Sequence, residues 1–239
     1  MNRNEAAPDV GQPAERPRGG ALRHLRWLAA GFVVGFLVPF VLADVLDLPR
    51  DLYYGGYAST VIVFVALWAR ATGQGLAARA RRRWRPAVSL GLICAAILAF
   101  AVIRTDPGTS RPDGLELAWA LAWRGVLYGA VDALLLSVFP ILAVFGAAAG
   151  SRLRTSAYGT IAVGAAAMVA SLGMTVAYHV GYSDFRSEKI VKPITGDLIW
   201  SVPTLVTLNP VGSTIAHVGL HVAAVLHSYD TDTFLPPHE

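Results

Sequence analysis

The feature of this sequence that most constrains its fold is a series of long, nearly uncharged apolar blocks. They cover residues 27–46, 53–68, 87–103, 115–149, 158–179 and 194–227. Apolar runs of about 18 residues or more are typical of helices that cross the ~30 Å hydrocarbon core of a bilayer. Only 15% of the residues are charged, whereas soluble domains have about a quarter. The pattern predicts an all-α, polytopic transmembrane helical bundle.

Blocks 115–149 and 194–227 leave the number of membrane crossings open. Each block is too long for one membrane span and too short for two full spans. As a single helix, block 115–149 would be about 52 Å long. It is compatible with one long tilted helix, or with two helices broken near Gly129–Ala133, and Pro140 offers a second kink. In block 194–227, Asn209-Pro210 predicts a break between a short helix and a final one. We therefore expect six to eight membrane helices.

Arginine clusters between the blocks predict the orientation of the chain. Five arginines lie in residues 3–26 and six in residues 70–85, whereas the loops expected on the other side hold only Arg50, Arg104 and Arg111. The positive-inside rule then places the N-terminus in the cytoplasm of a multi-pass cell-membrane protein. Anionic lipid headgroups are the expected partner of these clusters, and nucleic acid is not expected. The C-terminal tail holds no Lys or Arg, so the rule does not place it.

The chain divides by composition into four parts. Residues 1–22 are predicted to be a disordered cytoplasmic tail, and residues 23–104 contain three transmembrane helices. A polar-core region follows over residues 115–228, and residues 229–239 form a second tail. A single cysteine, Cys94, excludes an intrachain disulfide and a cysteine-based metal site.

The polar-core region carries most of the ionisable residues that interrupt apolar sequence, and such residues mark functional sites in membranes. Glu116, Arg124, Tyr128 and Asp132 fall on one i+4 row, so a regular helix would align them along one side. A structural interpretation is that Arg124 pairs with an acid, and that Glu116 is a first-turn acid favoured at a helix N-terminus.

Histidines provide candidate metal ligands in the same region. His217 and His221 lie four residues apart, the spacing at which one helix offers two nitrogens to a zinc ion. His179 ends an earlier block and is a third candidate ligand. The alternative for His217 and His221 is interhelical hydrogen bonding, and for His179 it is a residue at the membrane interface. The cofactor expected is therefore zinc or none.

The segments that carry Arg124, His179 and His217 follow one another in the chain. Together they resemble the CPBP (CAAX protease and bacteriocin-processing) family of intramembrane metalloproteases. Arg124-Gly125 match the Arg-Gly of its first motif, His179 the histidine of the second and His217 that of the third. The resemblance covers residues 115–228. It implies a metal held by glutamate and histidines, a glutamate that activates water, and a membrane peptide or protein as substrate.

The sequence departs from this family at several motif positions. Trp119 and Ala120 stand where the glutamate pair belongs, Thr175 replaces a phenylalanine, and His221 stands where an asparagine belongs. Glu116 is one candidate substitute for the missing base. A site of His179, His217 and His221 with an open fourth position is another arrangement, and a pseudoenzyme that keeps only the scaffold is a third.

Two further functions remain as alternatives to a protease. The missing glutamate pair is compatible with a non-catalytic membrane protein, such as a partner-binding or protective subunit. The polar row and the break at Asn209-Pro210 are compatible with a small transporter, because broken helices often line transport sites.

Overall fold

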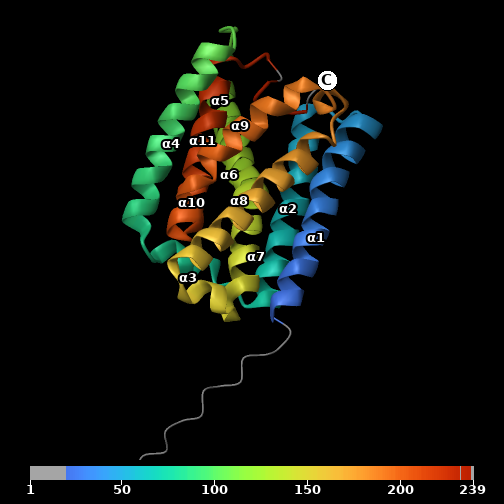
Figure 1. Ribbon diagram of the computed structural model, residues 1–239. Helices are drawn as coiled ribbons and strands as arrows, with labels where there is room; N and C mark the ends of the chain where they lie inside the picture. The colour runs from blue at the N-terminus through green and yellow to red at the C-terminus, as the bar shows by residue number, and fades with distance from the viewer. Residues whose placement is uncertain (1–19, 232, 238–239) are drawn as a thin grey trace, which may run out of the picture.

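The computed structural model describes residues 20–231 and 233–237, and throughout them it is a bundle of helices without a β-strand (Figure 1). Five helices are long and apolar enough to cross a membrane. They are α1 (Gly20–Pro39, continued by a π-helical turn Phe40–Val45), α2 (Arg50–Thr72), α4 (Trp84–Thr105), a continuous helix Gly114–Gly150, and α8 (Ala157–His179). The predicted all-α transmembrane bundle is confirmed. The tail predicted over residues 1–22 lies outside the described residues, except for the last three, which begin α1.

Block 115–149 is a single helix without the break considered near Gly129–Ala133. It runs through α5 (Gly114–Ala120), a π-helical segment Leu121–Leu127, α6 (Tyr128–Ala133), a second π-helical segment Leu134–Val138, and α7 (Phe139–Ala147) to Gly150. Its 37 residues make a helix of about 55 Å, so it is longer than the hydrocarbon core is thick.

Pro140 accounts for the second π-helical segment. Proline has no N–H, so the carbonyl four residues earlier, Leu136, has no helical donor. That carbonyl instead accepts a hydrogen bond of 2.8 Å from the hydroxyl of Ser171 on α8. Since an unpaired carbonyl inside a bilayer costs several kcal/mol, this bond fixes α8 against the long helix.

The break predicted at Asn209-Pro210 is confirmed. The block contains α9 (Val191–Trp200), α10 (Val202–Thr207) and α11 (Pro210–His227), and Leu208 has a positive φ of 54° between α10 and α11. Asn209 caps α11 through its side-chain oxygen, which accepts from Val211 N at 2.8 Å. Its amide nitrogen also donates to the carbonyls of Arg79, Ala80 and Arg82, and these bonds anchor α11 to α3 (Leu76–Arg81).

The helix ends form two opposite faces, and the five long helices run between them (Figure 1). At one face the start of α1 meets the end of α2, where Arg23 donates to the carbonyl of Ala71. At the other, Asp44 pairs with Arg186 at 2.8 Å, and the end of α11 bonds to the loop after α4. The shorter helices α9, α10 and α11 follow them in the chain.

The two faces differ sharply in charge. The first, here called the arginine face, holds ten arginines of the described residues and no Asp or Glu in its segments (20–30, 69–86, 148–158 and 200–212). The arginines are Arg23, Arg26, Arg70, Arg79, Arg81, Arg82, Arg83, Arg85, Arg152 and Arg154. The opposite face carries acids among its basic residues, including Asp44, Asp51 and Asp184.

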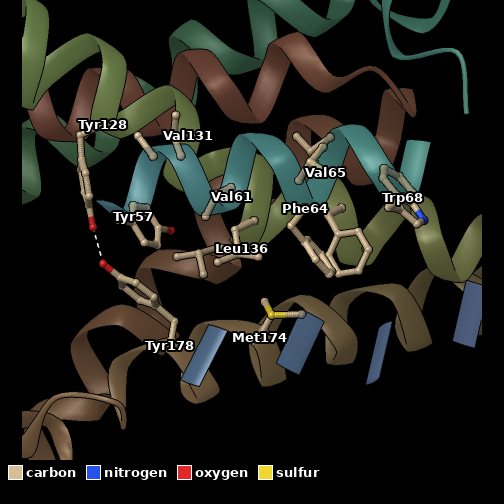
Figure 2. Packing of buried hydrophobic residues seen from close by; sticks show 14 of the residues in the cluster. Tyr57, Val61, Phe64, Val65, Trp68, Tyr128, Val131, Leu136, Met174 and Tyr178 are labelled. Carbon is tan, nitrogen blue, oxygen red and sulfur yellow. Dashed lines mark hydrogen bonds between the residues drawn. The ribbon is translucent and has the colours of Figure 1, made fainter. Parts of the chain in front are cut away.

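Aromatic side chains form the main core between α2, the long helix and α8 (Figure 2). Phe139 meets Phe64 and Trp68 of α2 edge to face, with ring centroids 5.1 and 5.0 Å apart. Leu136 and Met174 face the same row of α2 side chains. Such pairs add to the packing on which helix association in a bilayer depends.

Small residues allow α4 and α11 to pack closely. A Cβ added at Gly91 would lie 2.6 Å from the carbonyl oxygen of Gly212, and one added at Gly212 would lie 2.9 Å from the carbonyl oxygen of Ala87. Gly219 likewise faces Ala95. Close backbone approach at small residues is a common way for membrane helices to associate.

We therefore expect Gly91→Leu to destabilise the protein by about 1–3 kcal/mol, because the added side chain must separate α4 from α11. The measurement is the thermal unfolding midpoint in detergent. Gly164→Leu on α8 is the matched control, since a Cβ there has no neighbour within 4 Å. Equal midpoints for the two variants would contradict this account of the α4–α11 contact.

Candidate metal centre

Three buried side chains from two helices converge inside the bundle: Asp132 of α6 and His217 and His221 of α11. Asp132 Oδ2 lies 3.1 Å from His217 Nε2 and 3.6 Å from His221 Nε2, and the three ligand atoms lie within 4.8 Å of one another. Each residue is at most 4% exposed. No other such group of His, Cys, Asp or Glu occurs among the described residues. We call these residues the Asp132 cluster.

The spacing in the Asp132 cluster fits a divalent metal. Bonds of about 2.0–2.1 Å to zinc in a tetrahedral site place the ligand atoms about 3.3 Å apart, between the two distances found. His221 Nε2 is buried and has no hydrogen-bond partner in the described part of the chain. A lone pair left without a partner in this position is suited to a metal. Three protein ligands leave a fourth position for water or substrate.

Neighbouring side chains fix the orientation of the ligands. The hydroxyl of Tyr57 donates to Asp132 Oδ1 at 2.6 Å, which leaves Oδ2 directed at the histidines. Trp200 packs on His217 with ring centroids 4.3 Å apart, and Tyr128 meets His221 edge to face at 5.0 Å. These contacts restrict the rotamers of the ligands, whereas Nδ1 of His217 and Nδ1 of His221 have no hydrogen-bond partner in the described part of the chain.

The close packing around the cluster depends on Gly129, one helical turn before Asp132. A Cβ at this position would lie 3.0 Å from Val218 Cα and 3.2 Å from the carbonyl oxygen of His217. The absence of a side chain therefore allows α6 to approach the turn of α11 that carries the histidines.

The three residues of the Asp132 cluster line a cavity of about 300 Å³, together with residues of α4, α8, α9 and α11. His179, Tyr128 and Tyr178 also line this cavity. His179 belongs to the same site but not to the ligand group. Its Nδ1 is bonded to the carbonyl oxygen of Thr175 at 2.8 Å, and a ring nitrogen bonded to a carbonyl must carry the proton. In neutral His179 the Nε2 atom is therefore the proton acceptor.

The two other candidate site residues lie outside this cavity. Glu116 is exposed in the first turn of α5. Arg124 pairs with Asp51 at 3.3 Å and lies over the ring of Tyr229. The structure therefore brings neither Glu116 nor Arg124 to the histidines. The expected i+4 row fails because the π-helical segment Leu121–Leu127 changes the helical period between Glu116 and Asp132.

Sequence reasoning missed a cluster of buried tyrosines beside the metal centre. The hydroxyl of Tyr178 bonds to those of Tyr53 at 3.0 Å and Tyr182 at 2.7 Å, and also to that of Tyr128. Figure 2 shows the hydroxyls of Tyr128 and Tyr178 pointing at each other. The signal in the sequence was the run Tyr53-Tyr54-Gly-Gly-Tyr57 together with Tyr178 and Tyr182 at i+4 spacing.

A second buried acid, Asp197 of α9, lies behind the cavity and was also missed. It is fully buried and accepts hydrogen bonds from Ser171 at 3.1 Å and from Ser201. The hydroxyl of Ser201 also hydrogen-bonds to that of Ser137 on the long helix, at 2.8 Å. These bonds tie α9 to α8 and the long helix, and so position Trp200 against His217.

Comparison of the chain with protein-family models, with curated proteins and with solved structures finds no match. The site is therefore interpreted from its own geometry.

Proposed function

We propose that this polytopic membrane protein is a metal-dependent hydrolase that cleaves an acyl bond inside the bilayer. The observation that carries the proposal is the convergence of Asp132 Oδ2, His217 Nε2 and His221 Nε2 in the wall of a cavity. Two histidines and one carboxylate are a common ligand set of catalytic zinc sites in hydrolases. A divalent metal held there supplies a Lewis acid that polarises a carbonyl and makes water a better nucleophile.

The side chains around the Asp132 cluster then have separate roles. Asp132, His217 and His221 hold the metal, and Tyr57 holds Asp132. His179 is the general base, because its Nδ1–H is engaged by Thr175 and its Nε2 accepts a proton from the attacking water. The same nitrogen returns that proton to the leaving group. The hydroxyls of Tyr128 and Tyr178 bond to each other, so one of these two lining residues is a donor for the oxyanion that develops on the substrate.

This assignment changes what the resemblance to CPBP proteases implied. The carboxylate missing at Trp119 and Ala120 is supplied by Asp132, twelve residues beyond Ala120 on the same helix. His217 keeps its expected role as ligand, and His221 joins it. His179 acts in proton transfer rather than as a ligand. Membership of that family stays a prediction.

We also propose the orientation expected from the sequence, with the arginine face in the cytoplasm and in contact with anionic lipid headgroups. The described segments of the arginine face contain no acids, which supports both the cytoplasmic orientation and the contact with anionic headgroups. His179 and the first turn of α9 lie toward the opposite face (Figure 1). The cavity therefore belongs to the outer half of the cell membrane.

The proposal is tested with the full chain purified in detergent. We expect about one zinc ion per chain by inductively coupled plasma mass spectrometry, and hydrolysis of acyl esters or amides that stops when a chelator removes the zinc and returns when zinc is restored. Protein that retains no metal after purification in zinc-supplemented buffer and hydrolyses nothing would refute the proposal. A non-catalytic membrane protein would then be favoured.

A further inference from the structure

The cavity that leads to the Asp132 cluster has a mostly apolar wall. Leu98 and Ala101 of α4, Ile199 of α9 and Leu220 of α11 line it, together with Phe185. The cavity has a volume of about 300 Å³. The cavity therefore suits a short hydrocarbon segment whose polar end reaches the metal ligands.

The mouth of the cavity lies between two helices on the outside of the bundle. Four of the lining residues are exposed, namely Thr105 at the end of α4 and Val191, Lys192 and Thr195 in the first turns of α9. The outer sides of these helices carry exposed apolar residues, such as Phe100 at 66% and Leu198 at 48%. Such surfaces face lipid in a membrane protein, so a molecule reaches this mouth from the bilayer.

A hydrocarbon chain fits this wall better than a peptide does. An extended peptide in the bilayer must find partners for its own N–H and C=O groups. Apart from the Asp132 cluster, His179 and the tyrosines, the wall offers few polar side chains, and no strand occurs among the described residues that a peptide could pair with. A hydrocarbon chain has no N–H or C=O groups that need hydrogen-bond partners.

Charge at the mouth indicates the headgroup. Lys192 is the one cationic residue among the described lining residues, and no ion pair of its ammonium group occurs in the described part of the chain. An ammonium group close to the membrane surface attracts a phosphate or carboxylate of a lipid headgroup.

We infer that the substrate is an acyl lipid with an anionic headgroup, and this inference rests on the proposed hydrolase function. The headgroup lies at Lys192 and the scissile carbonyl at the Asp132 cluster. Hydrolysis breaks the acyl C–O or C–N bond, and the water oxygen becomes part of the released carboxylic acid. One water hydrogen passes through His179 to the leaving alcohol or amine, so the reaction needs no other reactant.

The test compares defined substrates with zinc-loaded full-length protein in mixed micelles. The probes are a monoacyl glycerophosphate, a monoacyl glycerophosphocholine, an N-acyl amino acid and a fluorogenic transmembrane peptide, and released fatty acid is measured by mass spectrometry. We expect the glycerophosphate to be cleaved about fivefold faster than the glycerophosphocholine. Lys192→Gln should remove this preference, so that the ratio of the two rates falls to about one.

A pair of variants on α4 tests the path of the acyl chain. Ala101→Phe narrows the cavity and should shift the preference to shorter acyl chains. Ala96→Phe on the exposed side of the same helix should leave the preference unchanged. An equal response to both variants would overturn the assignment of the cavity as the acyl site.

The outcomes separate this inference from the function on which it rests. Zinc-dependent cleavage of the peptide without cleavage of any lipid would overturn the inference and leave the hydrolase proposal standing. Cleavage of lipids at rates independent of Lys192 would overturn the headgroup assignment. Absence of both bound zinc and hydrolysis of every probe would refute the hydrolase proposal, and the inference with it.

Discussion

His217→Gln is expected to lower bound zinc from about one ion per chain to less than a tenth, and to abolish zinc-dependent hydrolysis. Loss of a residue that only supports a ligand weakens metal binding about 10–100-fold, so loss of a ligand should weaken it more. Glutamine is preferred to alanine because its amide can still donate to Asp132 Oδ2, 3.1 Å from His217 Nε2. Alanine would leave Asp132 Oδ2 without its nearest hydrogen-bond donor, at a cost of about 1–3 kcal/mol.

His227→Gln is the matched control on the same helix. His227 is the last residue of α11, and its Nε2 is bonded to the carbonyl oxygen of Asp106 at 3.1 Å, away from the Asp132 cluster. Its variant should retain zinc and activity. If His217→Gln binds zinc as tightly as this control does, the Asp132 cluster is not the metal site.

His179→Gln should separate catalysis from metal binding. If His179 transfers protons, its loss lowers kcat by about 10²–10⁴-fold while KM and the zinc content stay close to those of the wild type. The side chain is 8% exposed, and glutamine fills much of the same space. Steady-state kinetics and metal analysis on the same preparation provide the measurement.

The alternative role of His179 predicts a different result. The sequence suggested this residue as a third histidine ligand, and loss of a ligand would remove zinc together with activity. A zinc content that falls in parallel with kcat would therefore contradict the proton-transfer role. Thr175→Val is a useful comparison, since it keeps the backbone carbonyl that engages His179 Nδ1 and should retain most of the activity.

Features encoded by short stretches of sequence were predictable. The membrane helices follow from hydropathy, which needs no knowledge of tertiary contacts. The break at Asn209-Pro210 follows from the backbone of proline and the residue before it. His217 and His221 were paired correctly because one helical turn separates them, whatever helix they face.

Features that depend on packing between distant helices were not predictable. Asp132 lies 85 residues before His217 in the sequence, and only the crossing of α6 and α11 at Gly129 joins them. Tyr57 reaches the same carboxylate from α2. The interpretation of Glu116 and Arg124 as neighbours of the site assumed a uniform helical period, and the π-helical segment Leu121–Leu127 makes that assumption fail.

Two π-helical segments flank Asp132, one on each side, over Leu121–Leu127 and Leu134–Val138, and this has a consequence for how the protein can change over evolution. A π-helical turn holds one more residue than an α-helical turn, whereas adding or removing one residue in a regular α-helix rotates everything beyond it by about 100°. The two segments are places where single-residue insertions or deletions can be absorbed. The outer end of the helix, with Glu116, can therefore diverge in length and sequence while the carboxylate of Asp132 stays opposite its histidines.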